Sequence, residues 1–255
     1  GGDLIIGCEE GMVPISAAIN KDPAVLSIAA ISAPIEPDWR REATGRRSLP
    51  WEIVKFTRKG YAIVAMPVSA AGQEPIAFVV NTETGKWCRY TNWDMRCMVL
   101  HNDTLYFGTN DGRVKQAEVG GNDDGAGIYY TVVSNPDYLG DPSSLKTIMQ
   151  ARASFRSSTP FNAQVSASMD FSVNLPSPPN AAANAKSNEW DAGLWDQALW
   201  DATSPSLQIN SQWVAIGRTG YAFQWQLQIT GALTPSPKTD LLSIDVTFER
   251  GGSGI

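Results

Sequence analysis

Short apolar runs separated by sharp turn signals are the feature of this 255-residue sequence that most constrains its fold. Three such runs lie at Ile76–Val80, Cys97–Leu100 and Leu105–Phe107. The breaks that follow them read Asn-Thr-Glu-Thr-Gly, His-Asn-Asp and Thr-Asn-Asp-Gly, and these residue types accept a positive φ and hydrogen-bond their own backbone. Each break predicts a chain reversal, so the region predicts successive short β-hairpins.

The same frame recurs elsewhere in the chain. Leu4–Val13 repeats the order of apolar residues and paired glycines found in Leu105–Val114, while Tyr61–Met66 shares the apolar strand without the glycines. Hairpins that each expose an apolar face need neighbours to cover that face. We therefore expect an all-β fold in which propeller-like antiparallel blades form a radial or stacked array.

One part of this region carries a family resemblance. The sequence Gly85-Lys86-Trp87-Cys88-Arg89-Tyr90, followed by Leu105-Tyr106-Phe107-Gly108 and then by Gly112 and Val114, resembles the tail-tube nozzle, or packaged-DNA stabilisation, proteins of short-tailed bacteriophages. The resemblance extends over roughly residues 51–250 and is looser at 190–213 and 240–252. It implies a structural virion protein of the phage tail, with no enzymatic activity.

The resemblance also implies partners. In that family a ring of copies, commonly six, assembles below the portal and adaptor, and its lumen retains and then conducts the genome. The expected partners are therefore copies of the chain itself, the portal, the adaptor and other tail proteins, and genomic DNA that passes without tight binding. Because the sequence lacks an initiator Met and reaches a strand almost at once, we expect it to begin inside a larger protein whose earlier blades are missing.

Charge and hydropathy agree with these expectations. The formal net charge of −6 would let an acidic lumen wall repel phosphate, so that DNA slides without the contacts that release counterions. No apolar run approaches the ~20 residues that a membrane-spanning helix needs, so we expect no membrane partner.

A basic cluster lies in the segment from Asn20 to Leu49, which is rich in Ala, Pro and charge and which we expect to be a loop. Four arginines stand close to Trp39 and are candidates for contact with a partner: Arg40, Arg41, Arg46 and Arg47. Arginines beside an indole can bind phosphate or an acidic protein face. A protein contact or plain solvation is favoured over DNA, because the whole chain is acidic.

The glycine-rich segment at residues 120–127 predicts a boundary between two parts of the chain. We expect blade-like hairpins over 1–119, a linker over 120–127, and an antiparallel sheet or sandwich over 128–255. The acidic pair in the linker lacks the ligand spacing of a calcium-binding EF-hand loop.

The C-terminal part shows strand periodicity. Apolar and polar residues alternate over Phe161–Val173, Tyr221–Ile229 and Leu242–Phe248, and Thr147–Phe155 is a further strand candidate. Such strands bury one face of an antiparallel sheet, so we expect a β-sandwich or an open antiparallel sheet. The Pro- and Ala-rich stretches over 175–187 predict an exposed loop.

A Trp-Asp step occurs three times with a spacing of five residues, at Trp190, Trp195 and Trp200. This period fits neither a helix nor a strand and favours consecutive turns. The indoles could pack within the domain, anchor a subunit interface, or stack on a sugar while the carboxylates accept its hydroxyl hydrogens. The alternative function is therefore a receptor- or carbohydrate-binding β-module.

Catalytic and metal signatures are weak. Cys8, Cys88 and Cys97 lack Cys-x-x-Cys spacing and predict buried free thiols, and His101 is the one histidine. The carboxylates of the Trp-Asp repeat could serve paired-carboxylate hydrolysis, but nothing in the sequence sets their separation. We expect no catalytic residue, no metal site and no cofactor.

Overall fold

A computed structural model describes residues 4–19, 26, 28–68, 70–157, 161–175, 208–231 and 239–251. The chain is mostly β-sheet, with 53% strand and 11% helix, which confirms the expected all-β class. It divides into two compact units, residues 1–118 and 119–255. Within the described ranges, no helix is long and apolar enough to cross a membrane.

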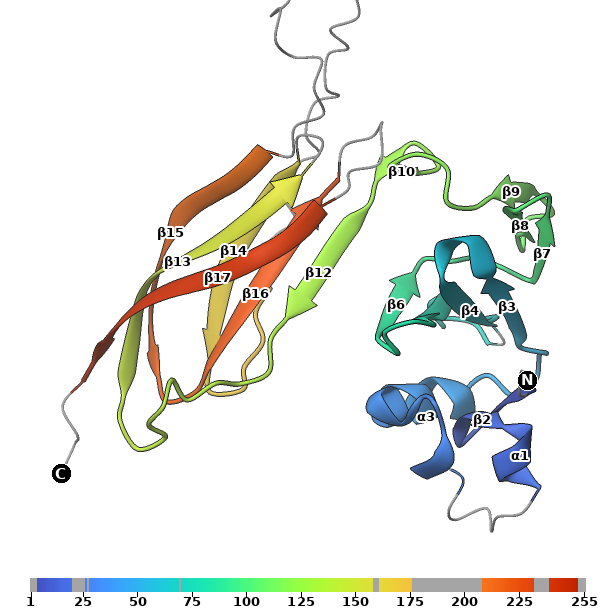
Figure 1. The fold of residues 1–255 in the computed structure, drawn as a ribbon, viewed down its shortest axis with the longest axis horizontal. Helices are drawn as coiled ribbons and strands as arrows, with labels where there is room; N and C mark the ends of the chain where they lie inside the picture. The colour runs from blue at the N-terminus through green and yellow to red at the C-terminus, as the bar shows by residue number, and fades with distance from the viewer. Residues whose placement is uncertain are drawn as a thin grey trace, which may run out of the picture. The chain divides into compact units, whose positions relative to one another are not determined.

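The N-terminal unit contains three antiparallel sheets, each made of strands that follow one another along the chain (Figure 1). A hairpin comprises β1 (Ile5–Cys8) and β2 (Gly11–Pro14). The four-stranded sheet comprises β3 (Glu52–Phe56), β4 (Tyr61–Met66), β5 (Ile76–Asn81) and β6 (Trp87–Thr91). The three-stranded sheet comprises β7 (Cys97–His101), β8 (Thr104–Gly108) and β9 (Val114–Gln116).

Local turn chemistry accounts for the hairpins in this unit. Asn81 accepts hydrogen bonds on Oδ1 from the backbone N–H groups of Glu83 and Thr84, both at 2.9 Å, at the reversal between β5 and β6. Between β7 and β8, Asn102 and Asp103 both have a positive φ, as a tight two-residue turn requires. These reversals confirm the predicted hairpins.

The expected propeller-like blades are seen only as up-and-down sheets. In the four-stranded sheet the spatial order β3-β4-β5-β6 equals the chain order, and β7-β8-β9 follows the same rule. Over the described part of the chain, no closed barrel or propeller is formed.

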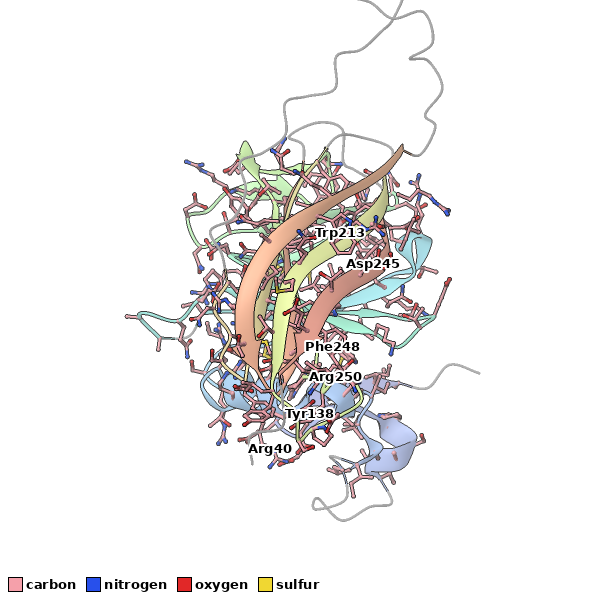
Figure 2. The ribbon with its side chains drawn as sticks, turned by 90° about the vertical axis from the view of Figure 1, so that its left-hand side faces the viewer. Arg40, Tyr138, Trp213, Asp245, Phe248 and Arg250 are labelled. Atoms are coloured by element: carbon pink, nitrogen blue, oxygen red, sulfur yellow. The ribbon has the colours of Figure 1, made fainter. Side chains whose placement is uncertain are left out.

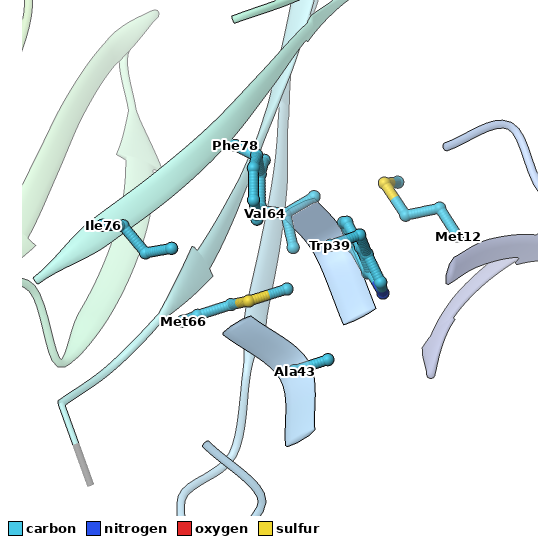
Figure 3. Close-up of a cluster of buried hydrophobic side chains, with 7 residues drawn as sticks. All are labelled: Met12, Trp39, Ala43, Val64, Met66, Ile76 and Phe78. Atoms are coloured by element: carbon cyan, nitrogen blue, oxygen red, sulfur yellow. The ribbon is translucent and has the colours of Figure 1, made fainter. Parts of the chain in front are cut away.

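The four-stranded sheet is covered on both faces. One face packs against helix α3 (Glu36–Thr44) and β2, through a cluster that Figure 3 shows around Trp39: Met12, Trp39, Ala43, Val64, Met66, Ile76 and Phe78. The other face packs against β8 and the residue that follows β9, through a second cluster: Phe56, Ile63, Ala77, Val79, Leu105 and Ala117. Neighbouring residues of β4 therefore enter different cores.

Helical segments border the sheets of this unit, and those at 33–35 and 36–44 correct the prediction of a loop over Asn20–Leu49. The structure has α1 (Ile15–Ala18), the 3₁₀ turns η1 (Ala33–Ile35) and η2 (Thr57–Lys59), and α3 (Glu36–Thr44). In α3, a proline lies in the first turn, acidic side chains lie near the N-terminus, and Glu36 and Arg40 form an i,i+4 ion pair of 3.0 Å. Trp39 and Ala43 lie one turn apart and are buried together.

The two copies of the internal repeat both form antiparallel hairpins, but their registers differ by one residue. Ile6 pairs with Val13, whereas Phe107, which has the place of Ile6 in the repeat, pairs with Lys115. The β8–β9 turn is longer, and the Thr109 hydroxyl accepts the N–H of Arg113 at 3.2 Å. Because a one-residue shift exchanges the faces of a strand, Val13 is buried while Val114 is 77% exposed.

The C-terminal unit contains two three-stranded antiparallel sheets. One has the order β15-β13-β17, with β13 (Lys146–Ser157) between β15 (Gln208–Gly220) and β17 (Thr239–Arg250). The other has the order β12-β16-β14, with β16 (Phe223–Thr230) between β12 (Tyr129–Val133) and β14 (Asn162–Met169). Two clusters that join β13 to β14 and β16 pack the sheets face to face.

The four strands predicted in this part exist, but they are shared between the two sheets. The alternation over Phe161–Val173 predicted a strand or a long hairpin arm, and β14 ends at Met169 because Asp170 and Phe171 turn the chain with positive φ. Asp170 then accepts the N–H groups of Tyr221 and Ala222 on Oδ1, at 2.8 and 3.1 Å. Strands β12 and β15 were not predicted, and the segment expected to be a linker contains a short ladder of β10 (Asn122–Asp123) and β11 (Ala126–Gly127).

The two-faced burial of β4 leads to a stability prediction. Ile63 is fully buried in the second core, so we expect Ile63→Ala to lower the free energy of unfolding by about 2–5 kcal/mol. Denaturant unfolding followed by tryptophan fluorescence measures the change. The control is Ile53→Ala on the edge strand β3, where the side chain is 38% exposed and a smaller loss is expected. Equal losses at the two positions would contradict the two-faced packing.

Candidate functional site

The arginine cluster predicted from the sequence is engaged within the N-terminal unit, and Arg46 is its buried member. Its side chain is only 3% exposed. The guanidinium donates to the Glu42 carboxylate (3.1 Å) and to the carbonyl oxygens of Met66 (3.2 Å) and Glu74 (2.5 Å). Arg46 therefore fastens the C-terminal end of α3 to the chain at the ends of β4 and β5. This position corrects the expectation that Arg46 is a surface contact for a partner.

The other arginines lie on the surface and are paired. Arg40 contacts Glu10 (2.5 Å) as well as Glu36, and Arg47 contacts Glu9. These contacts attach α3 and the residues after it to the turn between β1 and β2. The Trp39 indole N–H strengthens the attachment by donating to the Cys8 carbonyl oxygen at 2.9 Å.

Arg41 completes the set by pairing within its own helix. It lies 2.7 Å from Asp38 and 3.7 Å from Glu42. All four candidate arginines thus have carboxylate partners, and the patch carries acidic and basic groups together. Such a surface lacks the uncompensated positive charge that a phosphate-binding site needs.

Two contacts on this surface lower the pKa of the Glu9 carboxylate. Its pKa lies below the ordinary value because Thr44 donates a hydrogen bond to it at 3.0 Å and because Arg47 donates another. Both contacts favour the ionised form.

The tryptophans of the Trp-Asp repeat, Trp190, Trp195 and Trp200, lie outside the described residues. Their assignment as interface candidates stays a prediction, as does the alternative carbohydrate site.

Trp213 lies on the outer face of sheet β15-β13-β17, and it was not predicted as a site residue from the sequence. Arg152 on β13 lies directly between Trp213 on β15 and Asp245 on β17. Its guanidinium carbon lies 4.7 Å from the centre of the Trp213 ring, and its Nε and Nη2 donate to Asp245 at 3.0 and 2.5 Å. Figure 2 shows Trp213 and Asp245 on this curved sheet. These three side chains form a polar and aromatic row that is partly exposed. The ion pair and the cation–π contact link the three neighbouring strands of the sheet.

The thiols are free but not buried. Cys88 and Cys97 are exposed and Cys8 is half-buried, which corrects the prediction of buried thiols. Cys88 and Cys97 lie on β6 and β7, the edge strands of their sheets, where fewer neighbours cover a side chain. In the described ranges, no group of three or more His, Cys, Asp or Glu side chains is arranged to hold a metal ion.

Because Arg46 is buried, we expect its replacement to lower the free energy of unfolding strongly. We expect Arg46→Met to cost about 3 kcal/mol of unfolding free energy, because it removes a buried donor from two carbonyl oxygens and from Oε2 of Glu42. The exposed pair of Arg47 provides the matched control, and Arg47→Met should cost ~1 kcal/mol or less. Chemical denaturation of both variants tests the difference, and a mild loss in Arg46→Met would contradict the buried clamp.

The lowered pKa of Glu9 predicts how this attachment depends on pH. Stabilisation by the ionised carboxylate is fully present above the ordinary glutamate pKa of about 4.3 and is lost as the pH falls through the lowered value. We expect Thr44→Val to raise the pKa of Glu9 toward the ordinary value, as measured by NMR titration of its carboxyl carbon. Arg41→Met, which touches other carboxylates, should leave the Glu9 titration unchanged. A Glu9 pKa that Thr44→Val does not move would show that the hydrogen bond is absent.

Comparison with known proteins adds no relative: no family model and no curated protein matches this sequence.

Proposed function

We propose that this chain is part of a structural protein of a bacteriophage tail, a nozzle or tail-tube component. A ring of copies would assemble below the portal and adaptor and would retain and then conduct the genome. The observation that carries the proposal is the resemblance of residues 85–114 to the nozzle proteins of short-tailed phages.

The geometry of that region supports the proposal. Residues 85–114 run through β6, β7 and β8 to the start of β9, so they span the last strand of the four-stranded sheet and most of the three-stranded sheet. The two sheets share a core, and the Glu52 carboxylate on β3 accepts the N–H of Met98 on β7 at 2.5 Å. Consecutive up-and-down sheets that pack face to face are the building principle of propeller blades. We propose that these two sheets are blades of a propeller that includes further strands.

Electrostatics also supports a conduit. The net charge is −6, and each of the four clustered arginines has a carboxylate partner. A wall with a net negative charge would repel phosphate and make few of the contacts that slow DNA. The work of such a protein would lie in its shape and its assembly.

The proposal predicts assembly on a portal. We expect the native mass of the protein to increase to that of a ring when it is mixed with its portal–adaptor assembly, and negative-stain images should show a closed ring. A persistent monomer that ignores the portal would contradict this prediction.

Two further results would count against the conduit. Tight, salt-sensitive binding to duplex DNA would contradict it, because a conduit does not hold its cargo. Retention on immobilised glycans that is lost in Trp195→Ala, with no change in native mass, would instead support the carbohydrate-binding alternative.

A further inference from the structure

Strand β12 carries large side chains that remain exposed to solvent. All five of its residues are exposed, and none belongs to a core cluster of the sandwich. Tyr129, Tyr130, Val132 and Val133 remain 61, 42, 44 and 37% exposed. A contiguous set of exposed β-formers in a strand indicates a surface that another chain covers.

The backbone of β12 also has an open edge. Strand β12 is the outer strand of its sheet, and no described strand pairs with its other side. The Gly231 N–H donates to the Ile128 carbonyl oxygen (3.2 Å), and the Ser134 N–H donates to that of Trp225 (3.0 Å). These bonds join even-numbered residues to β16, so the N–H and C=O groups of Tyr129, Thr131 and Val133 point to the open edge.

Devices that normally block strand pairing are missing from β12. Edge strands are commonly protected by charges, prolines or bulges, and β12 has none of these over its five residues. The other outer strands differ. Strand β17 carries Asp240, Asp245 and Glu249, β15 carries Arg218, and the segment after β14 folds back so that Asn174 donates to the Ser168 hydroxyl at 3.1 Å.

We propose that β12 pairs with β12 of a second copy of this chain, antiparallel about a two-fold axis that passes between the two Thr131 residues. In this register Tyr129 lies opposite Val133 of the second copy, Tyr130 opposite Val132, and Thr131 opposite itself. The outward-pointing residues 129, 131 and 133 meet one another, which gives about six backbone hydrogen bonds. The two three-stranded sheets become one continuous sheet.

The sequence of the strand favours a copy of itself as the partner. Each cross-strand pair in this register is aromatic with β-branched, or threonine with threonine, and these are among the stabilising pairs of antiparallel sheets. The strand has no charge, so two copies do not repel each other at the contact. A shift of one residue would set outward-pointing groups against groups already bonded to β16, and a shift of two would bring fewer of the outward-pointing residues of β12 opposite one another. A two-fold contact closes on itself and cannot be the contact that repeats around a ring, so the inference is separate from the proposed ring.

Paired charge variants at Thr131 test both the contact and its register. We expect the full chain to be dimeric by sedimentation in the absence of portal. Thr131→Lys should raise the dissociation constant at least about tenfold, because two like charges then lie directly opposite each other. Thr131→Glu should do the same, and an equimolar mixture of the two variants should recover the dimer.

Two controls distinguish loss of this contact from the effect of an added charge elsewhere and from misfolding. Thr247→Lys places the same charge on an exposed threonine of β17 and should leave the mass unchanged. Circular dichroism should show that all the variants fold. A monomeric wild-type chain, an undisturbed dimer in Thr131→Lys, or a mixture that stays monomeric would each overturn the proposal.

Discussion

Strands β4 and β5 present apolar side chains on both faces of the N-terminal sheet, and the rest of that unit is organised by the need to cover both. Ile63 and Val64 are neighbours in sequence, and each is fully buried in a different core. The helix α3 and the β1–β2 hairpin supply one cover, and the β7–β9 sheet supplies the other. The buried guanidinium of Arg46 holds the first cover in place by bonding to the carbonyl oxygens of Met66, the last residue of β4, and of Glu74, just before β5.

Features set by local chemistry could be predicted from the sequence. The reversals at Asn81 and Asn102 depend on side chains and φ angles within a few residues, and they fold as predicted. The helix α3 could have been predicted in the same way from Pro37, the acidic residues near its start and the i,i+4 spacing of Glu36 and Arg40. The richness of the surrounding segment in Ala, Pro and charge favoured a loop instead.

Features set by distant contacts could not be predicted. Nothing in the local sequence distinguishes Arg46 from Arg47, because the burial of Arg46 depends on carbonyl groups that lie 20 and 28 residues away. Likewise, period-2 alternation predicts a strand without naming its neighbour, so it could not show that the C-terminal strands divide between two sheets. Strand β12 lacks alternation altogether and was missed.

The topology of the C-terminal sandwich also orders events during folding. Sheet β15-β13-β17 joins Arg152 to Asp245 across 93 residues, while Ser134, directly after β12, accepts the N–H of Trp225 on β16 across 91. Neither sheet is complete until late segments of the chain are available, so the sandwich closes long loops and folds slowly. The strands from β3 to β9 pair with their neighbours in sequence and can form while the ribosome is still adding the sandwich strands. During synthesis, the N-terminal unit is therefore expected to be structured first. Strand β12 has no partner strand until β16 has been synthesised.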